Sequence, residues 1–298
     1  MPVPAVHHPD YTFALPPRHP FPMEKFRVLR EQLQAFGDDL AWHLPDPITV
    51  EQLAGVHTQS YLDSLLGGTL DRAAQRRSGF EWSEALVQRV RLETGGTLLA
   101  ARLALEQGLA LNAAGGTHHA HADFASGYCL LNDLAVAVRV LLEEGAVSRV
   151  LVLDLDVHQG DGTARLLADE PRAFTCSFHA ASNFPGRKAR SDLDVPLAKG
   201  IEDDDYLAEL ERRLPVLLET LRPDLVIYDA GVDVHADDRL GHLLISDRGL
   251  LRRDQWVIQR VRSQGVPLAG VIGGGYDRDI GALAARHALF FRAAIMSE

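Results

Sequence analysis

The feature that most constrains the fold is a set of four short apolar runs, each followed at once by a cluster of glycine, histidine or aspartate. The runs are near-continuous Val, Leu and Ile, as expected for strands that are covered on both faces. Between them lie helical patterns, and such alternation is typical of βαβ units. We therefore predict an α/β fold with three layers, in which helices flank a central, mostly parallel sheet. The four runs are Leu109–Asn112, Val150–Leu153, Leu225–Tyr228 and Leu268–Ile272.

The polar clusters that follow these runs are expected to meet in one pocket. Ligands of open parallel sheets bind at the carboxyl ends of the strands. Together the clusters supply two carboxylates and a histidine for a metal, a histidine pair for proton transfer, and a tyrosine for an oxyanion. This combination indicates a metal-dependent amide hydrolase. The clusters are Gly115–His119, Asp154–Gly162, Asp229–Asp233 and Gly273–Tyr276.

The rest of the chain extends the same pattern. A further strand is expected at Phe174–Phe178, and the first 20 residues or so, rich in Pro and His, are expected to form an irregular arm. Without a repeat or a linker, residues 1–298 are predicted to form a single domain. The expected helices are Met23–Phe36, His57–Leu66, Ser83–Glu106, Asn132–Glu144, Asp161–Asp169, Asp204–Leu221, Asp247–Ser263 and Gly281–Ile295.

Composition excludes several classes of function. Hydrophobic residues make up 46% of the chain, enough for a sizeable core. No run of Lys and Arg would form a nucleic-acid stripe, so we expect no nucleic-acid partner. No apolar run is long enough to cross a bilayer, no secretory signal is visible, and we expect no membrane partner. The two cysteines, Cys129 and Cys176, cannot make a disulfide framework, so a cytoplasmic location is expected.

The formal net charge of the chain is −11. An acidic surface would favour cationic substrates by electrostatic steering, but solubility alone would also explain it. Nothing in the sequence indicates the oligomeric state.

Three residues after the second run have the spacing of a metal site. If the strand continues through Asp154, Asp156 and His158, all three side chains point to one face. Carboxylate oxygen and imidazole nitrogen suit a divalent metal such as zinc, and three protein ligands leave one position open. We predict Asp156, His158 and Asp233 as ligands, and Asp154 as a residue that orients a histidine. Such a pattern alone can be a polar strand end; the three other clusters favour the metal.

The adjacent histidines His118 and His119 follow a glycine pair, which lets the backbone approach a ligand closely. A buried imidazole needs an acceptor on its far nitrogen to fix its tautomer. Asp154 and Asp161 are the natural candidates. A carboxylate partner raises the pKa of an imidazole, which suits a general base near neutral pH.

An oxyanion donor and a channel wall complete the set. Tyr276 follows three glycines, and its phenol can donate a hydrogen bond to an oxyanion. No Lys-Ser/Thr follows these glycines, so a phosphate-binding loop is excluded; a tyrosine alone there would more often be a packing residue. Tyr128 is predicted to line a narrow channel for an extended alkyl chain. Cys129 is predicted to be buried filler.

These residues resemble the histone deacetylase family, whose members have the arginase–deacetylase fold. The resemblance runs in family order from about His57 to the last helix. Gln159 stands where class I and II members have a second histidine. Together with Asp229-Ala-Gly and Arg239-Leu-Gly, this resembles the class IV branch and its bacterial relatives. The matching motifs are GGTHHAHADFASGYCLLND, VLVLDLDVHQGDGTA, CSFHAASNFPG, DVPLAKGIEDDDY, YDAGVDVHADDRLG and GGGYD.

The resemblance implies a role for each matched position. The catalytic set comprises the two histidines, their two carboxylate partners and a tyrosine that polarises the scissile carbonyl: His118, His119, Asp154, Asp161 and Tyr276. Zn²⁺ is held by Asp156, His158 and Asp233, and Gly127 and Tyr128 line the acyl-lysine channel. A structural K⁺ is also implied, with ligands from the backbone of Asp154, Asp156, His158 and Phe178 and the side chains of Asp154 and Ser177.

The implied reaction is hydrolysis of an Nε-acyl-lysine in a protein or peptide, or of a small acylated amine. His119 takes the proton of the attacking water and later protonates the leaving amine. The segment Asn183–Asp194 is short compared with class I enzymes and shows no obvious second channel aromatic. We therefore expect a wider mouth that accepts acetyl or longer groups. The alternatives are an acetylpolyamine amidohydrolase, a dinuclear-manganese ureohydrolase on the same fold and an inactive acyl-lysine reader.

Overall fold

The four apolar runs form four neighbouring strands at the centre of one eight-stranded sheet. The computed structural model describes residues 1–298, and every strand pair in it is parallel, in the order β2-β1-β3-β8-β7-β4-β5-β6. The predicted parallel α/β class is confirmed. The strands are Val3–Val6 (β1), Leu40–His43 (β2), Leu109–Asn112 (β3), Val150–Asp154 (β4), Ala173–Ala180 (β5), Leu193–Leu197 (β6), Leu225–Asp229 (β7) and Leu268–Val271 (β8).

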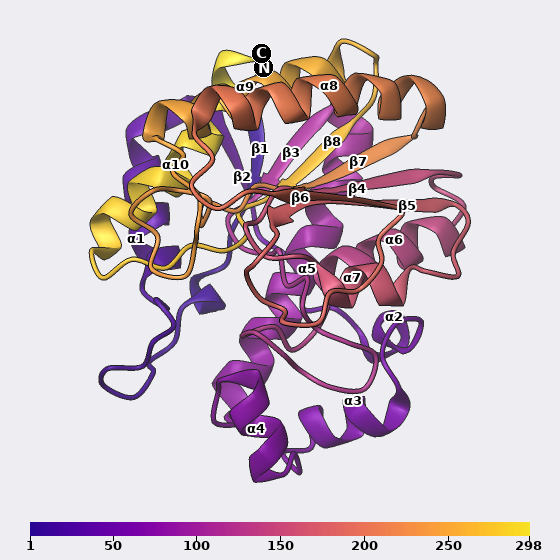
Figure 1. Ribbon diagram of the computed structural model, residues 1–298. Helices are drawn as coiled ribbons and strands as arrows, with labels where there is room; N and C mark the ends of the chain where they lie inside the picture. The colour runs from indigo at the N-terminus through magenta and orange to yellow at the C-terminus, as the bar shows by residue number, and fades with distance from the viewer.

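Helices cover both faces of this sheet (Figure 1). One layer holds α1 (Lys25–Gln32), α8 (Asp203–Leu221), α9 (Asp247–Arg262) and α10 (Ile280–Met296), and the other holds α5 (Glu84–Gln107), α6 (Asp133–Glu143) and α7 (Asp161–Leu166). The short helices α2 (Val50–Ala54), α3 (Gln59–Leu66) and α4 (Arg72–Ser78) extend from the second layer. None of the helices is both long and apolar enough to span a bilayer.

Local sequence signals explain where the long helices begin. Ser83, Asn132, Ser246 and Asp279 precede α5, α6, α9 and α10, and each side chain accepts a hydrogen bond from a backbone N–H three residues on. Such caps satisfy donors that the first helical turn leaves free. The central strands β3, β4, β7 and β8 are buried along their whole length. The layers therefore hold the carboxyl ends of these strands rigidly side by side.

The expected irregular arm over the first 20 residues or so is wrong for its beginning, whereas residues 12–20 contain no helix or strand. Residues Val3–Val6 form β1, an internal strand between β2 and β3. The backbone N–H of Ala113 donates to Val6 O at 2.8 Å, and that of His7 donates to His43 O at 3.1 Å. The four residues of this strand, one of them a proline, are too short a pattern to reveal it. Its register is set by β2 and β3, which lie far away in sequence.

Two further expectations need correction. The second run does not continue as a strand through Asp156 and His158: β4 ends at Asp154, and both residues lie on the irregular segment that follows. The helix predicted over Met23–Phe36 is α1 followed by a 3₁₀ segment, Leu33–Asp39, with a break at Gly37 (φ +50°). The strands β2 and β6 were not predicted, since each is only four or five residues long and lies on an edge of the sheet.

Candidate functional site

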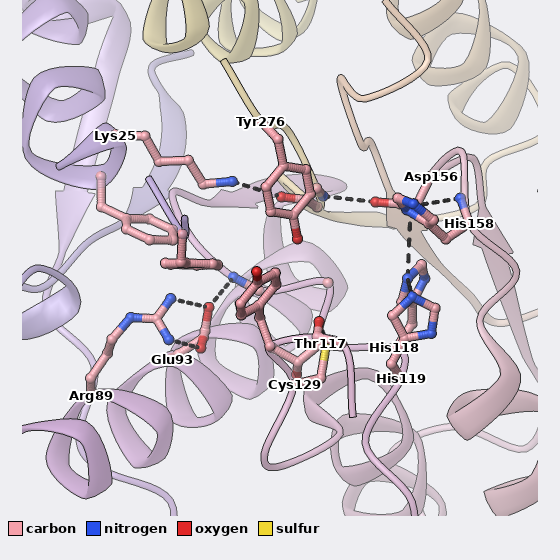
Figure 2. Close-up of a pocket in the computed structure, with 18 residues that line it drawn as sticks. Lys25, Arg89, Glu93, Thr117, His118, His119, Cys129, Asp156, His158 and Tyr276 are labelled. Atoms are coloured by element: carbon pink, nitrogen blue, oxygen red, sulfur yellow. Dashed lines mark hydrogen bonds and ion pairs between the residues drawn. The ribbon is translucent and has the colours of Figure 1, made fainter. Parts of the chain in front are cut away.

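The loops after β3, β4, β7 and β8 converge on one cavity. These four strands are adjacent in the sheet, in the order β3-β8-β7-β4, so their carboxyl ends meet. The cavity continues outwards into an open basin that Tyr128 and Tyr276 also line. Figure 2 shows the inner cavity, with Tyr276 pointing into it between the histidines on one side and Lys25 on the other. The predicted site residues that line it are His118, His119, Gly127, Tyr128, Asp156, His158 and Tyr276.

The three predicted metal ligands lie together. His158 Nδ1 is 3.0 Å from Asp156 Oδ1 and 3.1 Å from Asp233 Oδ2, and one ligand atom from each of the three lies within 4.8 Å of the others. The backbone fixes both carboxylates: Gly274 N–H donates to Asp156 Oδ2 at 2.8 Å, and Val157 N–H donates to Asp233 Oδ1 at 2.8 Å. Two carboxylates and one imidazole around a common point suit a divalent cation.

The glycine at position 274 shows how tightly this cluster is enclosed. A Cβ there would lie 2.3 Å from Asp233 Oδ2 and 2.4 Å from Asp156 Oδ2. Only a residue without a side chain lets the backbone reach both carboxylates. The run Gly273–Gly275 is therefore part of the cradle around the cluster, which fits the ion that the donor set implies.

In the absence of a cation, the cluster binds a proton instead. Burial alone would lower the pKa of His158, but its hydrogen bonds to Asp156 and Asp233 outweigh burial and raise the pKa to about 10. Burial and the neighbouring Asp156 carboxylate raise the pKa of Asp233 to about 7. A cation and this proton compete for the same electrons, so each excludes the other.

The adjacent histidines each have one carboxylate partner. His118 Nδ1 is 2.8 Å from Asp154 Oδ2, and His119 Nδ1 is 2.8 Å from Asp161 Oδ1. The two Nε2 atoms lie 3.2 Å apart and face the cavity. All four side chains are buried. These are the partners that the sequence suggested, and each carboxylate fixes the orientation and the tautomer of its imidazole.

The two histidines differ in charge, which the sequence analysis did not anticipate. Burial would lower the pKa of His118, but the carboxylates of Asp154 and Asp156 hold it well above its ordinary value. For His119 the balance is reversed: burial and the positive charge of His118 lower the pKa to about 3, against the raised value expected from a carboxylate partner. His118 thus favours the cation, and His119 favours the neutral imidazole, whose Nε2 lies 3.2 Å from His118 Nε2.

Asp229, at the end of β7, is a member of the site to which sequence reasoning gave no role. It is fully buried, neither carboxyl oxygen has a hydrogen-bond partner, and Oδ2 lies 3.7 Å from His118 Nδ1. Burial and the Asp154 carboxylate raise its pKa well above the ordinary value. His118, Asp154 and Asp229 form a second group of possible ligands. An ion there would separate His118 from Asp154, so this group does not favour a dinuclear site.

The channel has two aromatic walls, not one. Tyr128 stands on one side, with Gly127 before it (φ +55°), where a Cβ would come within 2.6 Å of His119 Cδ2. Phe184 also lines the basin, and its ring packs edge-on against His119, with centroids 4.7 Å apart and planes at 87°. Phe184 lies in the short segment in which no channel aromatic was obvious. Its position after Asn183 and before a proline was the available signal.

Charged residues line the inner end of the cavity. Lys25 Nζ lies 3.3 Å from Gly273 O, and Arg89 pairs with Glu93 at 3.0 Å. All three side chains are buried, and burial lowers the pKa of Lys25 to about 8. Figure 2 shows them opposite the metal cluster. The inner cavity has a volume of only about 40 Å³, room for a few water molecules. Sequence reasoning missed these residues because they lie on helices far from the motifs.

The residues implied for potassium also lie together in part. Ser177 on β5 pairs with Asp154 in the sheet, and both line a cavity of about 10 Å³. Phe178 is the next residue along β5 and is fully buried. The potassium ion itself remains a proposal.

Comparison with known proteins agrees with this geometry. Residues 19–290 match the model of the histone deacetylase domain. The chain is 49% identical over 296 residues to an uncharacterized protein of Picosynechococcus sp., covering 98% of each. It is 33% identical over 269 residues to Histone deacetylase 2 of Arabidopsis thaliana, covering 87% of this chain and 70% of that protein. Histone deacetylase RPD3 of Saccharomyces cerevisiae is 30% identical over 283 residues, which cover 87% of this chain and 64% of that protein.

A solved structure matches the whole architecture. The crystal structure of the HDA15 HD domain superposes with a TM-score of 0.81 at 21% identity, covering 99% of this chain and 91% of that one. The arginase–deacetylase fold expected from the sequence is confirmed.

Proposed function

Because the chain belongs to the histone deacetylase family, an amide-hydrolysing family, we propose that it is a zinc-dependent enzyme that removes acyl groups from Nε-acyl-lysine. The observation that carries this proposal is the convergence of two histidine–carboxylate pairs, one cationic and one neutral, on a three-ligand cluster.

Asp156, His158 and Asp233 would hold the zinc. When bound, the ion lowers the pKa of a water molecule and polarises the amide carbonyl. Their burial excludes bulk water from the ligand atoms, and Gly274 keeps two of the carboxylate oxygens in place.

The remaining steps use the chain's own residues. Neutral His119 accepts the proton of the attacking water on Nε2, while Asp161 accepts the hydrogen bond of Nδ1–H. The same proton is then delivered to the leaving amine nitrogen as the C–N bond breaks. His118 stays protonated and donates a hydrogen bond from Nδ1 to Asp154. Its positive charge stabilises the negative charge that develops on the carbonyl oxygen. The Tyr276 hydroxyl, which points into the cavity, donates a hydrogen bond to that oxygen.

The cavity favours short acyl groups. The lysine alkyl chain would pass between Tyr128 and Phe184, and the acyl group would enter the inner cavity. That cavity is about 40 Å³ and is lined by Lys25, Arg89 and Glu93. A long hydrocarbon would have to displace or desolvate buried charges, which is costly. We therefore propose acetyl and similarly short groups as substrates, rather than the longer groups that the short Asn183–Asp194 segment suggested.

The test is a series of lysine peptides that carry acyl groups from acetyl to long-chain, assayed with the purified, metal-analysed protein. We expect turnover that falls with acyl length, one zinc per chain, and loss of activity on chelation that zinc restores. His119→Ala should retain the metal and lose turnover, because the base is removed and the ligands are not. A variant that keeps more than about a tenth of the wild-type rate would contradict the role of His119. A stoichiometric pair of manganese ions would instead favour the ureohydrolase alternative.

A further inference from the structure

The mouth of the channel carries the opposite charge to the chain as a whole. The formal net charge is −11, yet the outer basin, with a volume of about 580 Å³, is lined by three arginines and by no aspartate or glutamate. Arg76 and Arg77 come from the last turn of α4, and Arg239 comes from the loop between β7 and α9. All three side chains are exposed. The rim is therefore a cationic patch on an acidic protein.

These arginines differ from many others on the surface in having no carboxylate partner. Arg27, Arg212 and Arg252, for example, each pair with a glutamate or aspartate within 2.8 Å. None of the three rim guanidinium groups takes part in such an ion pair. Arg77 lies 4.9 Å from the centroid of the Phe124 ring, a contact that leaves its charge in place.

The acid next to Arg239, Asp238, forms no ion pair with the rim arginines, because its carboxylate binds backbone N–H groups of the loop. Asp238 accepts hydrogen bonds from the backbone N–H groups of Tyr276 at 2.6 Å, Leu240 at 2.8 Å and Gly241 at 2.9 Å. Arg239 N–H donates to Tyr276 O at 3.0 Å. The backbone that carries Arg239 is thus tied directly to the residue that carries the oxyanion donor.

The end of α4 is tied to the channel in the same way. Tyr128 N–H donates to Ser78 O at 3.1 Å, and the Tyr128 ring packs over Gly79. Arginines in the last turn of a helix also interact favourably with its free carbonyl groups. This interaction with the helix end explains the two arginines on α4. It does not explain Arg239, which lies on a loop, or the absence of carboxylates from the basin. The arginines stand at fixed places around the channel through which a substrate would enter.

We propose that the substrate presents negative charge beside the acylated amine, as an acyl-lysine flanked by aspartate or glutamate in an acidic peptide segment. This inference rests on the proposed deacylase function and adds the class of its substrate. The carboxylates of the peptide would pair with the rim arginines, which raises the association rate and fixes the peptide over the channel. A polycationic substrate, such as an acetylpolyamine, would meet three like charges at the same place.

The test uses three peptides of equal length centred on Nε-acetyl-lysine, with aspartate, alanine or lysine at the flanking positions, and free Nε-acetyl-lysine as a fourth substrate. For the wild-type chain we expect kcat/KM to be about tenfold or more higher for the acidic than for the basic peptide. The difference should lie in KM, and it should shrink as salt screens the charges. Higher activity on free Nε-acetyl-lysine than on any peptide would assign the rim to a small carboxylate-bearing amine and overturn the peptide proposal.

Matched variants assign the effect to the rim. Arg239→Gln and Arg77→Gln should each lower the acidic-to-basic ratio, and the double variant, which leaves only Arg76 on the rim, should bring it closest to one. Arg72→Gln removes the same charge from the first turn of α4, outside the basin, and should keep the wild-type ratio. Equal ratios in all of these chains would overturn the inference.

A binding measurement separates this inference from the proposed function. Fluorescence anisotropy with labelled acidic and basic peptides and the His119→Ala variant reports affinity without turnover. Tighter binding of the acidic peptide, lost in Arg77→Gln/Arg239→Gln, supports the inference even if no peptide is hydrolysed, in which case only the deacylase proposal fails. Turnover of all peptides with equal affinity would leave the deacylase proposal standing and refute the anionic substrate.

Discussion

At the scale of single residues, the site depends on neighbours that give chemically identical side chains different charges. His118 and His119 are adjacent and each has an aspartate partner at 2.8 Å. His118 also faces Asp156 at 3.7 Å and Asp229 at 3.7 Å, whereas His119 faces His118. Surrounding carboxylates stabilise the cation of the first, and that cation disfavours protonation of the second. One of the pair can therefore act as a base while the other remains charged.

The first prediction concerns the pH dependence of metal binding. The pKa of His158 is raised to about 10 by its carboxylate partners, so without metal the imidazole is protonated at neutral pH. A cation must displace that proton. Metal affinity should therefore rise with pH below about 10 and weaken as pH falls, by up to about tenfold per unit for one proton. Calorimetric titration of the apo protein with zinc, in buffers of different ionisation enthalpy, should show release of about one proton; affinity that does not change between pH 6 and 8 would contradict this.

The second prediction concerns the oxyanion donor. Tyr276→Phe removes only the hydroxyl that points into the cavity, while the backbone bonds of residue 276 to Asp238 and Arg239 remain. We expect kcat to fall by about 10² or more, since the lost hydrogen bond strengthens in the transition state. Binding of a hydroxamate inhibitor should weaken only modestly, and thermal stability should change little. An unchanged rate would remove Tyr276 from the mechanism.

At the scale of elements, the loops are shaped by glycines at which the chain passes close to the site. Gly127 has φ +55°, and a Cβ there would come within 2.6 Å of His119 Cδ2 and 3.3 Å of Phe184 Cε1. Gly145, between α6 and β4, has a similar φ of +69° but nothing within 4 Å of its Cβ position. Alanine substitutions at these two positions therefore distinguish the effect of backbone strain from the effect of displacing His119, the proposed base.

The third prediction uses this pair. Gly127→Ala and Gly145→Ala should each destabilise the fold by about 1 kcal/mol, because alanine tolerates positive φ poorly. Only Gly127→Ala should also lower kcat, by about 10²-fold, since it pushes His119 out of line. Thermal unfolding and steady-state rates for both variants provide the check. Loss of activity in Gly145→Ala, or full activity in Gly127→Ala, would show that the contact with His119 is not what matters.

Gln159, on the segment that follows β4, holds two loops of the site together. Its side-chain amide donates to Ala189 O at 3.1 Å and to Asp194 Oδ1 at 2.7 Å, and its carbonyl accepts from Ala189 N at 2.7 Å. The residue therefore fastens the segment that carries Phe184 to the loop that carries His158. In the sequence, Gln159 served only to indicate a branch of the family. In the structure, it helps to position the channel wall.

At the scale of the whole molecule, the site depends on a sheet to which the N-terminus contributes an internal strand. β1 lies between β2 and β3 and is buried along its length. Its removal would leave β2 without a strand partner, unpair the edge of β3 that faces β1, and expose the apolar side of α5, which packs on β1. The loop after β3, which carries both catalytic histidines, would lose its support.

The fourth prediction follows from this arrangement. Deletion of residues 1–8 should destabilise the protein by on the order of 4 kcal/mol or more, because buried hydrogen bonds and apolar contacts are lost together. Deletion of residues 1–2, which precede the strand and are exposed, should have little effect. Soluble yield and thermal unfolding of the two truncated chains compare them directly. Equal stability of both would show that β1 is dispensable.

The sequence alone determined the parallel α/β class, the four central strands and the residues that gather at their carboxyl ends. The reason is physical: buried parallel strands must be continuously apolar, and the polar residues that follow them, such as Asp154 and Asp229, have only one edge of the sheet at which to lie. Those signals are local in the chain, so they can be read without knowing the fold. The family motifs lie in the same segments.

Only the tertiary structure decided which residues complete the site and what charge they carry. β1 has no pattern of its own, Lys25 reaches the cavity from a helix far from the motifs, and the places of Phe184 and Arg239 at its mouth depend on how their loops fold. The pKa values of His118 and His119 depend on carboxylates from the ends of β4 and β7, from the segment after β4 and from α7. The net charge of −11 likewise concealed a cationic rim, because electrostatic interactions depend on distances in space, and a sum over the sequence contains none.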